Sequence, residues 1–150
     1  MMSQQISKDV LKAAVNILSR KLYSEYELRC KLSSKGYTTT SIDLAIKELT
    51  KRGYIDDAAL CDILIRKYYT ASKYSQNYII LKLKGRGLDE HLIDSTLNKY
   101  SDFDEFTAAI NALKKRYSDP ETIETVKVTR YLLSKGFSFN TINTITSKKI

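Results

Sequence analysis

The chain has 150 residues, a formal net charge of +8 and a single histidine. No apolar run is long enough to cross a bilayer, and the opening residues MMSQQISKDV lack the basic flank and apolar stretch of a signal peptide. We therefore expect a cytoplasmic protein with no membrane partner. The excess of 25 Lys and Arg over 17 Asp and Glu favours a polyanionic partner, either a nucleic acid or an acidic protein surface.

The composition favours helices throughout the chain. One Pro and five Gly leave long stretches without a helix breaker. The two cysteines, Cys30 and Cys61, are interpreted as reduced, packed thiols, because a chain without an export signal rarely forms a disulfide.

The first segment begins with a predicted helix that ends near Leu22. Its apolar residues recur at helical spacing, namely Val10, Leu11, Ala14, Val15 and Leu18. Ser24 precedes Glu27 by three residues, which is the capping-box pattern of a helix start. We therefore predict a second helix that begins after Ser24 and buries Leu28 and Leu32.

Gly36 is predicted to end this second helix, because a glycine after the last helical residue adopts the left-handed conformation at little cost. Tyr37 is expected to fold back onto the helix as an apolar lid. A cap within Thr39 to Ser41 then starts a third helix that ends at Gly53. Its apolar stripe consists of Ile42, Ala45, Ile46 and Leu49.

The second segment follows the same plan. Its first helix ends in the run Arg66-Lys67-Tyr68-Tyr69, and Ser75 starts the next helix as Ser24 does. Gly87 and Leu88 take the places of Gly36 and Tyr37. The apolar residues that support this alignment are Leu60, Ile63, Leu64, Leu83, Ile93 and Leu97.

The third segment matches in outline. Lys114-Lys115-Arg116 closes its first helix, and Pro120 is predicted at a helix start. Phe137 takes the place of Tyr37. The last helix is degraded, with Thr146 and Lys149 where the earlier copies have apolar residues. The apolar residues of the first helix are Phe103, Phe106, Ile110 and Leu113.

The three segments are copies of one pattern, with Gly36, Gly87 and Gly136 in register at intervals of roughly 50 residues. We predict an all-α fold of three tandem three-helix repeats, each like a helix-turn-helix, in an elongated and curved row. The predicted repeats are residues 1–54, 55–100 and 101–150. Stacked units usually present one extended surface to a large partner, which favours a binding protein over an enzyme.

One run of the sequence resembles a known family. The run SEYELRCKLSSKGYTTTSIDLAIKELTKRGYIDD contains a serine-initiated helix, the Lys35-Gly36-Tyr37 turn and the junction Gly53-Tyr54-Ile55-Asp56-Asp57. In these features the chain resembles RecX, the bacterial regulator of the recombinase RecA. The junction also has a structural interpretation, in which Tyr54 and Ile55 pack between units and Asp56 or Asp57 caps the next helix.

The resemblance implies a function. RecX-like proteins lie in the helical groove of RecA assembled on single-stranded DNA, where they hinder filament growth, ATP hydrolysis and strand exchange. It therefore implies a regulator of DNA repair and recombination within the SOS response. The expected partner is the RecA filament, with single-stranded DNA open to direct contact. We expect a monomer with no cofactor of its own and no small-molecule substrate.

The candidate contacts with a partner are basic residues and Tyr69, with the nearby rings of Tyr68 and Tyr74 as an extension that can stack on bases or pack in a protein groove. Similar helices in similar frames would align their charges into a stripe, although each charge taken singly is also explained by solvation or by pairing at a helix end. The candidates are Arg20, Lys21, Arg29, Lys31, Lys35, Arg66, Lys67, Tyr69, Lys73, Lys82, Lys84, Arg86, Arg130 and Lys135. Structural roles are assigned to Gly36, Gly53, Tyr54, Asp57, Gly87 and Gly136.

The sequence offers little for catalysis. His91 has no nucleophile signature near it, and no Cys and His residues have the spacing of a zinc site. Asp56-Asp57 and Asp89-Glu90 stand at predicted helix starts, where capping explains them, and Lys84-Gly85-Arg86-Gly87 lacks the spacing of a phosphate loop. We expect no enzyme activity, no catalytic residue and no metal.

Direct DNA binding through helix-turn-helix repeats is the alternative function. The third helix of each repeat would then read DNA. Acidic side chains on these helices argue against it, since they would repel phosphates: Asp43, Glu48, Asp89, Glu90 and Asp94.

Overall fold

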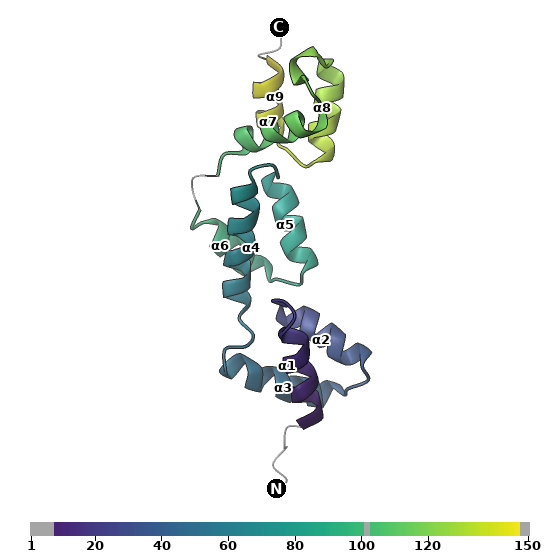
Figure 1. Ribbon diagram of the computed structural model, residues 1–150. Helices are drawn as coiled ribbons and strands as arrows, with labels where there is room; N and C mark the ends of the chain where they lie inside the picture. The colour runs from purple at the N-terminus through teal and green to yellow at the C-terminus, as the bar shows by residue number, and fades with distance from the viewer. Residues whose placement is uncertain (1–7, 101–102, 148–150) are drawn as a thin grey trace.

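The structure is a computed structural model that describes residues 8–100 and 103–147 (Figure 1), and over these residues it contains helices and no strand. The all-α prediction is confirmed. The helices are α1 (Lys8–Leu18), α2 (Glu25–Ser34), α3 (Thr39–Lys51), α4 (Asp57–Ala71), α5 (Gln76–Gly85), α6 (Glu90–Leu97), α7 (Glu105–Arg116), α8 (Thr125–Ser134) and α9 (Phe139–Ser147), with a 3₁₀ turn at Pro120–Thr122. No helix in the described ranges combines the length and the apolar character that a membrane crossing requires.

The helices form three groups in an elongated row, with α1 in the group at one end and α9 in the group at the other (Figure 1). Within each group the three helices contact one another. Each group also has its own cluster of buried apolar side chains. We propose residues 54 and 100 as the boundaries and call the groups the first, second and third units.

The core of the first unit confirms the predicted second and third helices. Leu28 and Leu32 of α2 are buried, and so is the whole predicted stripe of α3. The first helix differs from its prediction, because Ile17 is buried with Val10 and Ala14 whereas Val15 is exposed. Apolar residues occupy two neighbouring stripes of α1, and α2 and α3 cover one of them.

The same effect occurs in the second unit. Ile63, one of the apolar residues that supported the alignment, is exposed, while Cys61 and Ile65 are buried beside Leu60 and Leu64. In the third unit small residues form the contact face of α7, with Ala108, Ala109, Ala112 and Leu113 buried. Phe103, Phe106 and Ile110 are packed against that cluster but only half-buried.

The helix starts follow the predicted capping chemistry. Ser24 Oγ accepts a hydrogen bond from the Glu27 N–H at 3.1 Å, and the Glu27 carboxylate accepts one from the Ser24 N–H at 2.9 Å, so the capping box is confirmed. Ser75 caps α5 in the same way, accepting from the Tyr78 N–H at 3.0 Å. At the junction it is Asp56 that caps α4.

The end of the first helix and the start of the third differ from their predicted positions. The first helix ends at Leu18 and not near Leu22, because Arg20 N–H bonds to the Ile17 carbonyl and Ser19 Oγ to the Asn16 carbonyl, which closes the helix with a tighter turn. The cap of α3 is Thr38, one residue before the predicted range, since Thr38 keeps an extended backbone and its Oγ1 accepts from the Ser41 N–H.

Each second helix ends in the predicted glycine turn. Gly36, Gly87 and Gly136 all have positive φ, between +79° and +92°. The residue after each glycine donates its N–H to the carbonyl four residues before that glycine, as in a Schellman motif. Leu88 and Phe137 are buried as lids, and Tyr37 is half-buried.

The turn of one unit packs on the start of the second helix in the preceding unit, and we call these contacts the first and second seams. In the first seam Ser24 Oγ donates to the Arg86 carbonyl, and Gly87 lies against Tyr26. In the second seam Ser75 Oγ donates to the Lys135 carbonyl at 2.8 Å. The two seams therefore repeat one contact between equivalent residues.

The second seam has further contacts of its own. Asn77 Nδ2 donates to the Gly136 carbonyl at 3.2 Å, and Asn111 Nδ2 donates to the Ser72 carbonyl at 2.7 Å. Phe103 packs against the cores of both the second and the third unit. Polar and apolar contacts thus hold the third unit to the second.

The junction between the first two units matches its prediction in part. Ile55 is buried in the first core, and Asp57 accepts a hydrogen bond from the Glu25 N–H at 3.0 Å. The predicted packing of Tyr54 was wrong, because its side chain is 57% exposed. Gly53, with φ +81°, turns the chain so that Ile55 enters the core and Tyr54 points to solvent.

The end of the chain agrees with a degraded last helix. Thr146 is half-buried and bonds through its hydroxyl to the Ile142 carbonyl at 3.0 Å, so it contributes little apolar area. Pro120 begins a 3₁₀ turn, as predicted for a helix start. Lys149 lies outside the described residues.

Replacing Gly87 by alanine should destabilise the protein by about 3 kcal/mol, because the new Cβ combines left-handed strain with a clash. That Cβ would lie 2.4 Å from the Cβ of Tyr26. Gly53→Ala is the matched control, since Gly53 has nearly the same φ and open space around it, and should cost about 1 kcal/mol. Urea unfolding of both variants measures the difference, and equal losses would show that the seam contact is unimportant.

The two thiols should react at very different rates with a thiol-specific disulfide reagent. Cys30 is exposed, which corrects the prediction that both thiols are packed. Cys61 is buried, and burial raises the pKa of its thiol. We expect the native protein to titrate one thiol rapidly and the second only in denaturant. Cys30→Ser should remove the rapid phase, and a rapid phase that persists in this variant would contradict the packing of Cys61.

Candidate partner-binding surface

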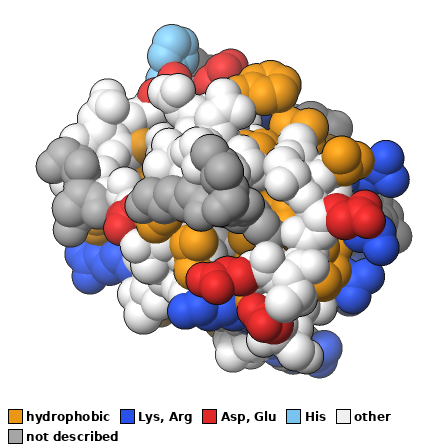
Figure 2. Space-filling view, turned by 90° about the horizontal axis from the view of Figure 1, so that it is seen from above, with side chains coloured by type: hydrophobic (Ala, Val, Ile, Leu, Met, Phe, Trp, Pro, Cys, Tyr) orange, Lys and Arg blue, Asp and Glu red, His pale blue; other side chains and the backbone are white. Residues whose placement is uncertain are grey.

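The second helices α2, α5 and α8 lie on the same side of the row (Figure 1). Lys31 lies on α2, Lys82 on α5 and Tyr131 on α8. Lys35 and Lys135 directly follow the ends of α2 and α8. In the view along the row, Lys and Arg side chains lie at several places around its edge, with acidic and apolar side chains between them (Figure 2). The helices that carry or precede these basic residues are thus on one side of the row (Figure 1).

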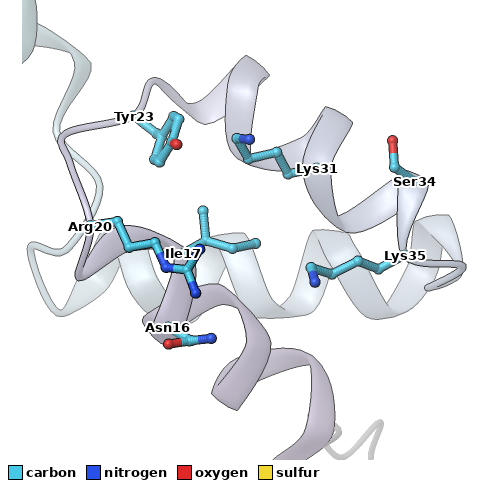
Figure 3. A pocket seen from close by; sticks show the side chains of 7 residues that line it. All are labelled: Asn16, Ile17, Arg20, Tyr23, Lys31, Ser34 and Lys35. Carbon is cyan, nitrogen blue, oxygen red and sulfur yellow. The ribbon is translucent and has the colours of Figure 1, made fainter.

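In the first unit, basic side chains surround a hollow of about 360 Å³. The hollow lies between the C-terminal end of α1 and the helix α2. Figure 3 shows Arg20, Lys31 and Lys35 around this space, with the Tyr23 ring beside it. The Nζ atoms of Lys21 and Lys31 lie 4.9 and 5.0 Å from the centre of that ring, which is cation–π distance. The hollow is therefore lined by three predicted residues, Arg20, Lys31 and Lys35, and by the aromatic ring of Tyr23.

In the second unit three tyrosines form a cluster at the start of α5. The rings of Tyr74 and Tyr78 are stacked with centres 4.8 Å apart, and Tyr68 meets both rings with its edge. Lys73 lies over Tyr74 and Lys82 over Tyr78, each 5.4 Å from the ring centre. Burial raises the pKa of the Tyr68 hydroxyl. Tyr68 and Tyr74 both pack against the second core, which fixes the cluster in place.

In the third unit Tyr131 and Lys135 repeat the pairing, with Lys135 Nζ 5.7 Å from the ring centre. Both residues line a second hollow, of about 230 Å³, at the second seam. We call the combined set the lysine–tyrosine surface. It consists of Arg20, Lys21, Tyr23, Lys31, Lys35, Lys73, Tyr74, Tyr78, Lys82, Lys115, Tyr131 and Lys135.

Most of the other predicted candidates are paired with residues of this chain. Arg29 pairs with Asp43 and with Glu25, Arg66 pairs with Asp62 at 2.7 Å, and Lys84 pairs with Glu90 at 3.5 Å. Arg66 also donates to the Tyr100 hydroxyl. Tyr69 stacks on Phe103 with ring centres 4.4 Å apart. Lys67 and Arg130 are exposed, Lys67 on α4 and Arg130 on α8.

Arg86 is the most firmly held of the predicted contacts. Its guanidinium donates to both oxygens of the Glu27 carboxylate, at 2.9 to 3.1 Å, and to the Leu22 carbonyl at 2.6 Å. Both side chains of the pair are less than a quarter exposed. Partial burial acts to raise the pKa of Glu27, but hydrogen bonds from Arg86 and from the Ser24 N–H outweigh it, and the net direction is downward. Arg86 therefore closes the first seam.

The structure adds members that the sequence reasoning left out of the stripe: Tyr23, Tyr78, Lys115 and Tyr131. Two of them had a signal in the repeat register. Tyr23 precedes the capping serine of a second helix, as Tyr74 does. Tyr131 lies five residues before the turn glycine Gly136, as Lys31 and Lys82 lie before Gly36 and Gly87. Lys115 had no such signal in the sequence, because its proximity to Lys73 depends on how the second and third units pack.

The described residues offer no constellation for catalysis or metal binding. His91 is exposed in the first turn of α6. Within residues 8–100 and 103–147, no three His, Cys, Asp or Glu side chains are grouped so as to hold a metal ion. The acidic residues Asp56 and Asp89 act as helix caps, as predicted.

Comparison with known proteins identifies the family. A family model described as the first three-helix domain of RecX matches residues 11–49. The regulatory protein RecX of Mannheimia succiniciproducens is 30% identical over 129 residues, which cover 83% of each chain. The chain belongs to the RecX family. RecX of Legionella pneumophila (strain Corby) is 31% identical over 140 residues, covering 89% of each chain.

The RecX fold extends over nearly the whole chain. The crystal structure of RecX from Lactobacillus salivarius superposes with a TM-score of 0.77, at 28% identity and with 94% of each chain covered. The RecX domain match at residues 11–49 contains Arg20, Lys31 and Lys35, so most of the first hollow lies within it.

Breaking the pair between Glu27 and Arg86 should cost about 2 kcal/mol at neutral pH, between the values for buried and for exposed ion pairs. Arg86→Met is the test. Arg52→Met removes an exposed pair with Glu48 and should cost less than about 1 kcal/mol. Chemical denaturation measures both, and equal costs would argue against a special role for Arg86.

The contribution of this pair should also depend on pH. Because the pKa of Glu27 is lowered in the folded state, its stabilising effect is present above the ordinary Glu pKa and is lost as the pH falls through the folded-state value. The stability gap between wild type and Arg86→Met should therefore narrow in acid. Denaturation series at neutral pH and at about pH 3 measure it, and a gap of constant size would contradict the assignment.

Proposed function

We propose that this chain regulates RecA by binding its filament on single-stranded DNA through the lysine–tyrosine surface. Bound there, it hinders filament growth, ATP hydrolysis and strand exchange, and so modulates DNA repair and recombination. The observation that carries the proposal is membership of a family of regulatory proteins, in a chain that has an extended basic surface.

The shape of the molecule supports this mode of action. A row of three units reaches further than a compact domain of the same mass, so it can touch several subunits of a repeating assembly at once. Contacts that are individually weak then add up, because each one raises the effective concentration for the next. A monomer suits this role, since the row already supplies several contacts from one chain.

The chemistry of the surface supports the type of partner. Lysines are compact charges on flexible stems, and on this surface they lie beside tyrosine rings in each unit. Such a surface attracts acidic protein groups and phosphates alike. A RecA filament on DNA offers both kinds of group.

Direct reading of DNA through the third helices is less well supported. Asp43 of α3 forms an ion pair with Arg29 of α2. This arginine is therefore already paired within the first unit. The first turn of α6 is acidic, with Glu90 beside the cap Asp89. The third helices α3 and α6 therefore present acidic groups, which oppose the approach of phosphates to a recognition helix.

Reversing charge on the lysine–tyrosine surface should relieve inhibition of RecA. We expect the wild-type protein to reduce ATP hydrolysis by RecA of the same organism on single-stranded DNA, at concentrations well below those that coat the DNA. The variant Lys31→Glu/Lys35→Glu/Lys82→Glu should need at least roughly tenfold more protein for the same effect, because three charge contacts are reversed. Arg86 is left unchanged because it closes the first seam.

The matched control reverses three exposed lysines outside the surface, Lys47, Lys51 and Lys99. This control has the same net charge as the test variant and should inhibit like the wild type. Equal loss in both variants would show that only the overall charge matters. An unchanged ATPase rate, or inhibition only when the DNA is saturated, would favour direct nucleic-acid binding instead.

A further inference from the structure

The two seams differ at one pair of equivalent positions. In the first seam, Glu27 lies three residues after the capping Ser24 and neutralises Arg86, the residue that ends α5. In the second seam, Tyr78 lies three residues after the capping Ser75, and Lys135 ends α8. The carboxylate of the first seam is thus replaced by a phenol in the second, while the cation remains.

Two further lysines converge on the same place. Lys73 precedes α5 and Lys115 lies in the last turn of α7, so they come from different units, and both line the second hollow with Lys135. The neighbouring Lys73 lowers the pKa of Lys115, through its side-chain hydrogen bonding and its charge. Within the described part of the chain, no carboxylate lies within ion-pair distance of these three lysines.

The hollow is open and has a defined lining. Its walls are the rings of Tyr74, Tyr78 and Tyr131, and its volume is about 230 Å³. Three cations around a small polar space, with no internal anion, are an unfavourable arrangement that an added anion relieves. The seam has the form of an ion-pair site from which the acidic member is missing.

We propose that this hollow binds a phosphate group of single-stranded nucleic acid, held by Lys73, Lys115 and Lys135 in the place that the Glu27 carboxylate has in the first seam. Lysines act on phosphate as point charges, and the phenol of Tyr78 adds a hydrogen-bond donor. The tyrosine rings beside the lysines offer flat surfaces to the adjoining bases once the lysine side chains turn toward the phosphate. This favours a polynucleotide over an acidic peptide.

Binding at this place joins two units. Lys73 and Tyr78 belong to the second unit, whereas Lys115 and Lys135 belong to the third. A phosphate between them replaces repulsion by attraction across the second seam, so the strand should hold the two units together more firmly. The site consists of residues of this chain alone, and its test needs no RecA. A negative result would therefore leave the proposed action on RecA standing.

The test uses the full chain without RecA and a fluorescently labelled oligothymidylate of about ten nucleotides, followed by anisotropy at low salt. Lys115→Gln should weaken binding about tenfold, the usual effect of losing one charge-assisted contact. Tyr78→Glu should abolish binding, because its carboxylate would occupy the site as Glu27 does in the first seam. Circular dichroism checks that each variant is folded. If Tyr78→Glu is unfolded, the result for Lys115→Gln alone decides whether the site exists.

The matched control is Lys114→Gln, which removes the same charge from the neighbouring exposed residue and should leave binding within about twofold of wild type. Equal weakening by Lys114→Gln and Lys115→Gln would overturn the site in favour of unspecific charge. Inorganic phosphate should compete only weakly with the oligonucleotide, since it lacks bases. A polyglutamate peptide is also tested as a competitor. If it displaces the labelled oligonucleotide as effectively as unlabelled oligonucleotide does, the hollow binds an acidic protein segment and the proposal is overturned.

Discussion

The hydroxyl group of one serine per seam is the contact on which the arrangement of the units depends. Ser24 and Ser75 each accept a hydrogen bond from the backbone of their own helix and donate one to the carbonyl that ends the second helix of the next unit. That carbonyl belongs to the last turn of a helix, where no partner exists within the helix itself. One side chain thus caps two helices, and Gly87 and Gly136 make the approach close enough because neither has a Cβ.

This contact also decides which charges are left for a partner. The arginine that ends α5 is drawn into the first seam by Glu27, and Arg29 and Arg66 are likewise paired within their units. Arginine suits such internal sites because its planar fork binds a carboxylate with two hydrogen bonds. Most cations of the lysine–tyrosine surface are lysines beside tyrosine rings, and Arg20 is the one arginine among them.

Local chemistry explains why much of the fold could be predicted from sequence. The capping box at Ser24, the glycine turns and the apolar stripe of α3 each depend on residues a few positions apart. The exposure of Val15 and Ile63 could not be predicted. The helices α1 and α4 each have two apolar stripes, and only tertiary packing decides which stripe is buried. The partners of Arg86 and Lys115 could not be predicted, since they depend on residues of other units.

The two seams should respond to different conditions, because the side chains across them differ in kind. Across the first lies an ion pair with its surrounding hydrogen bonds, and such contacts weaken as salt or acid is added. Across the second, Phe103 is shared between two cores, and apolar contacts weaken on cooling. A single short chain therefore contains a joint that loosens with ionic strength and another that loosens in the cold, so its stiffness along the row is not uniform.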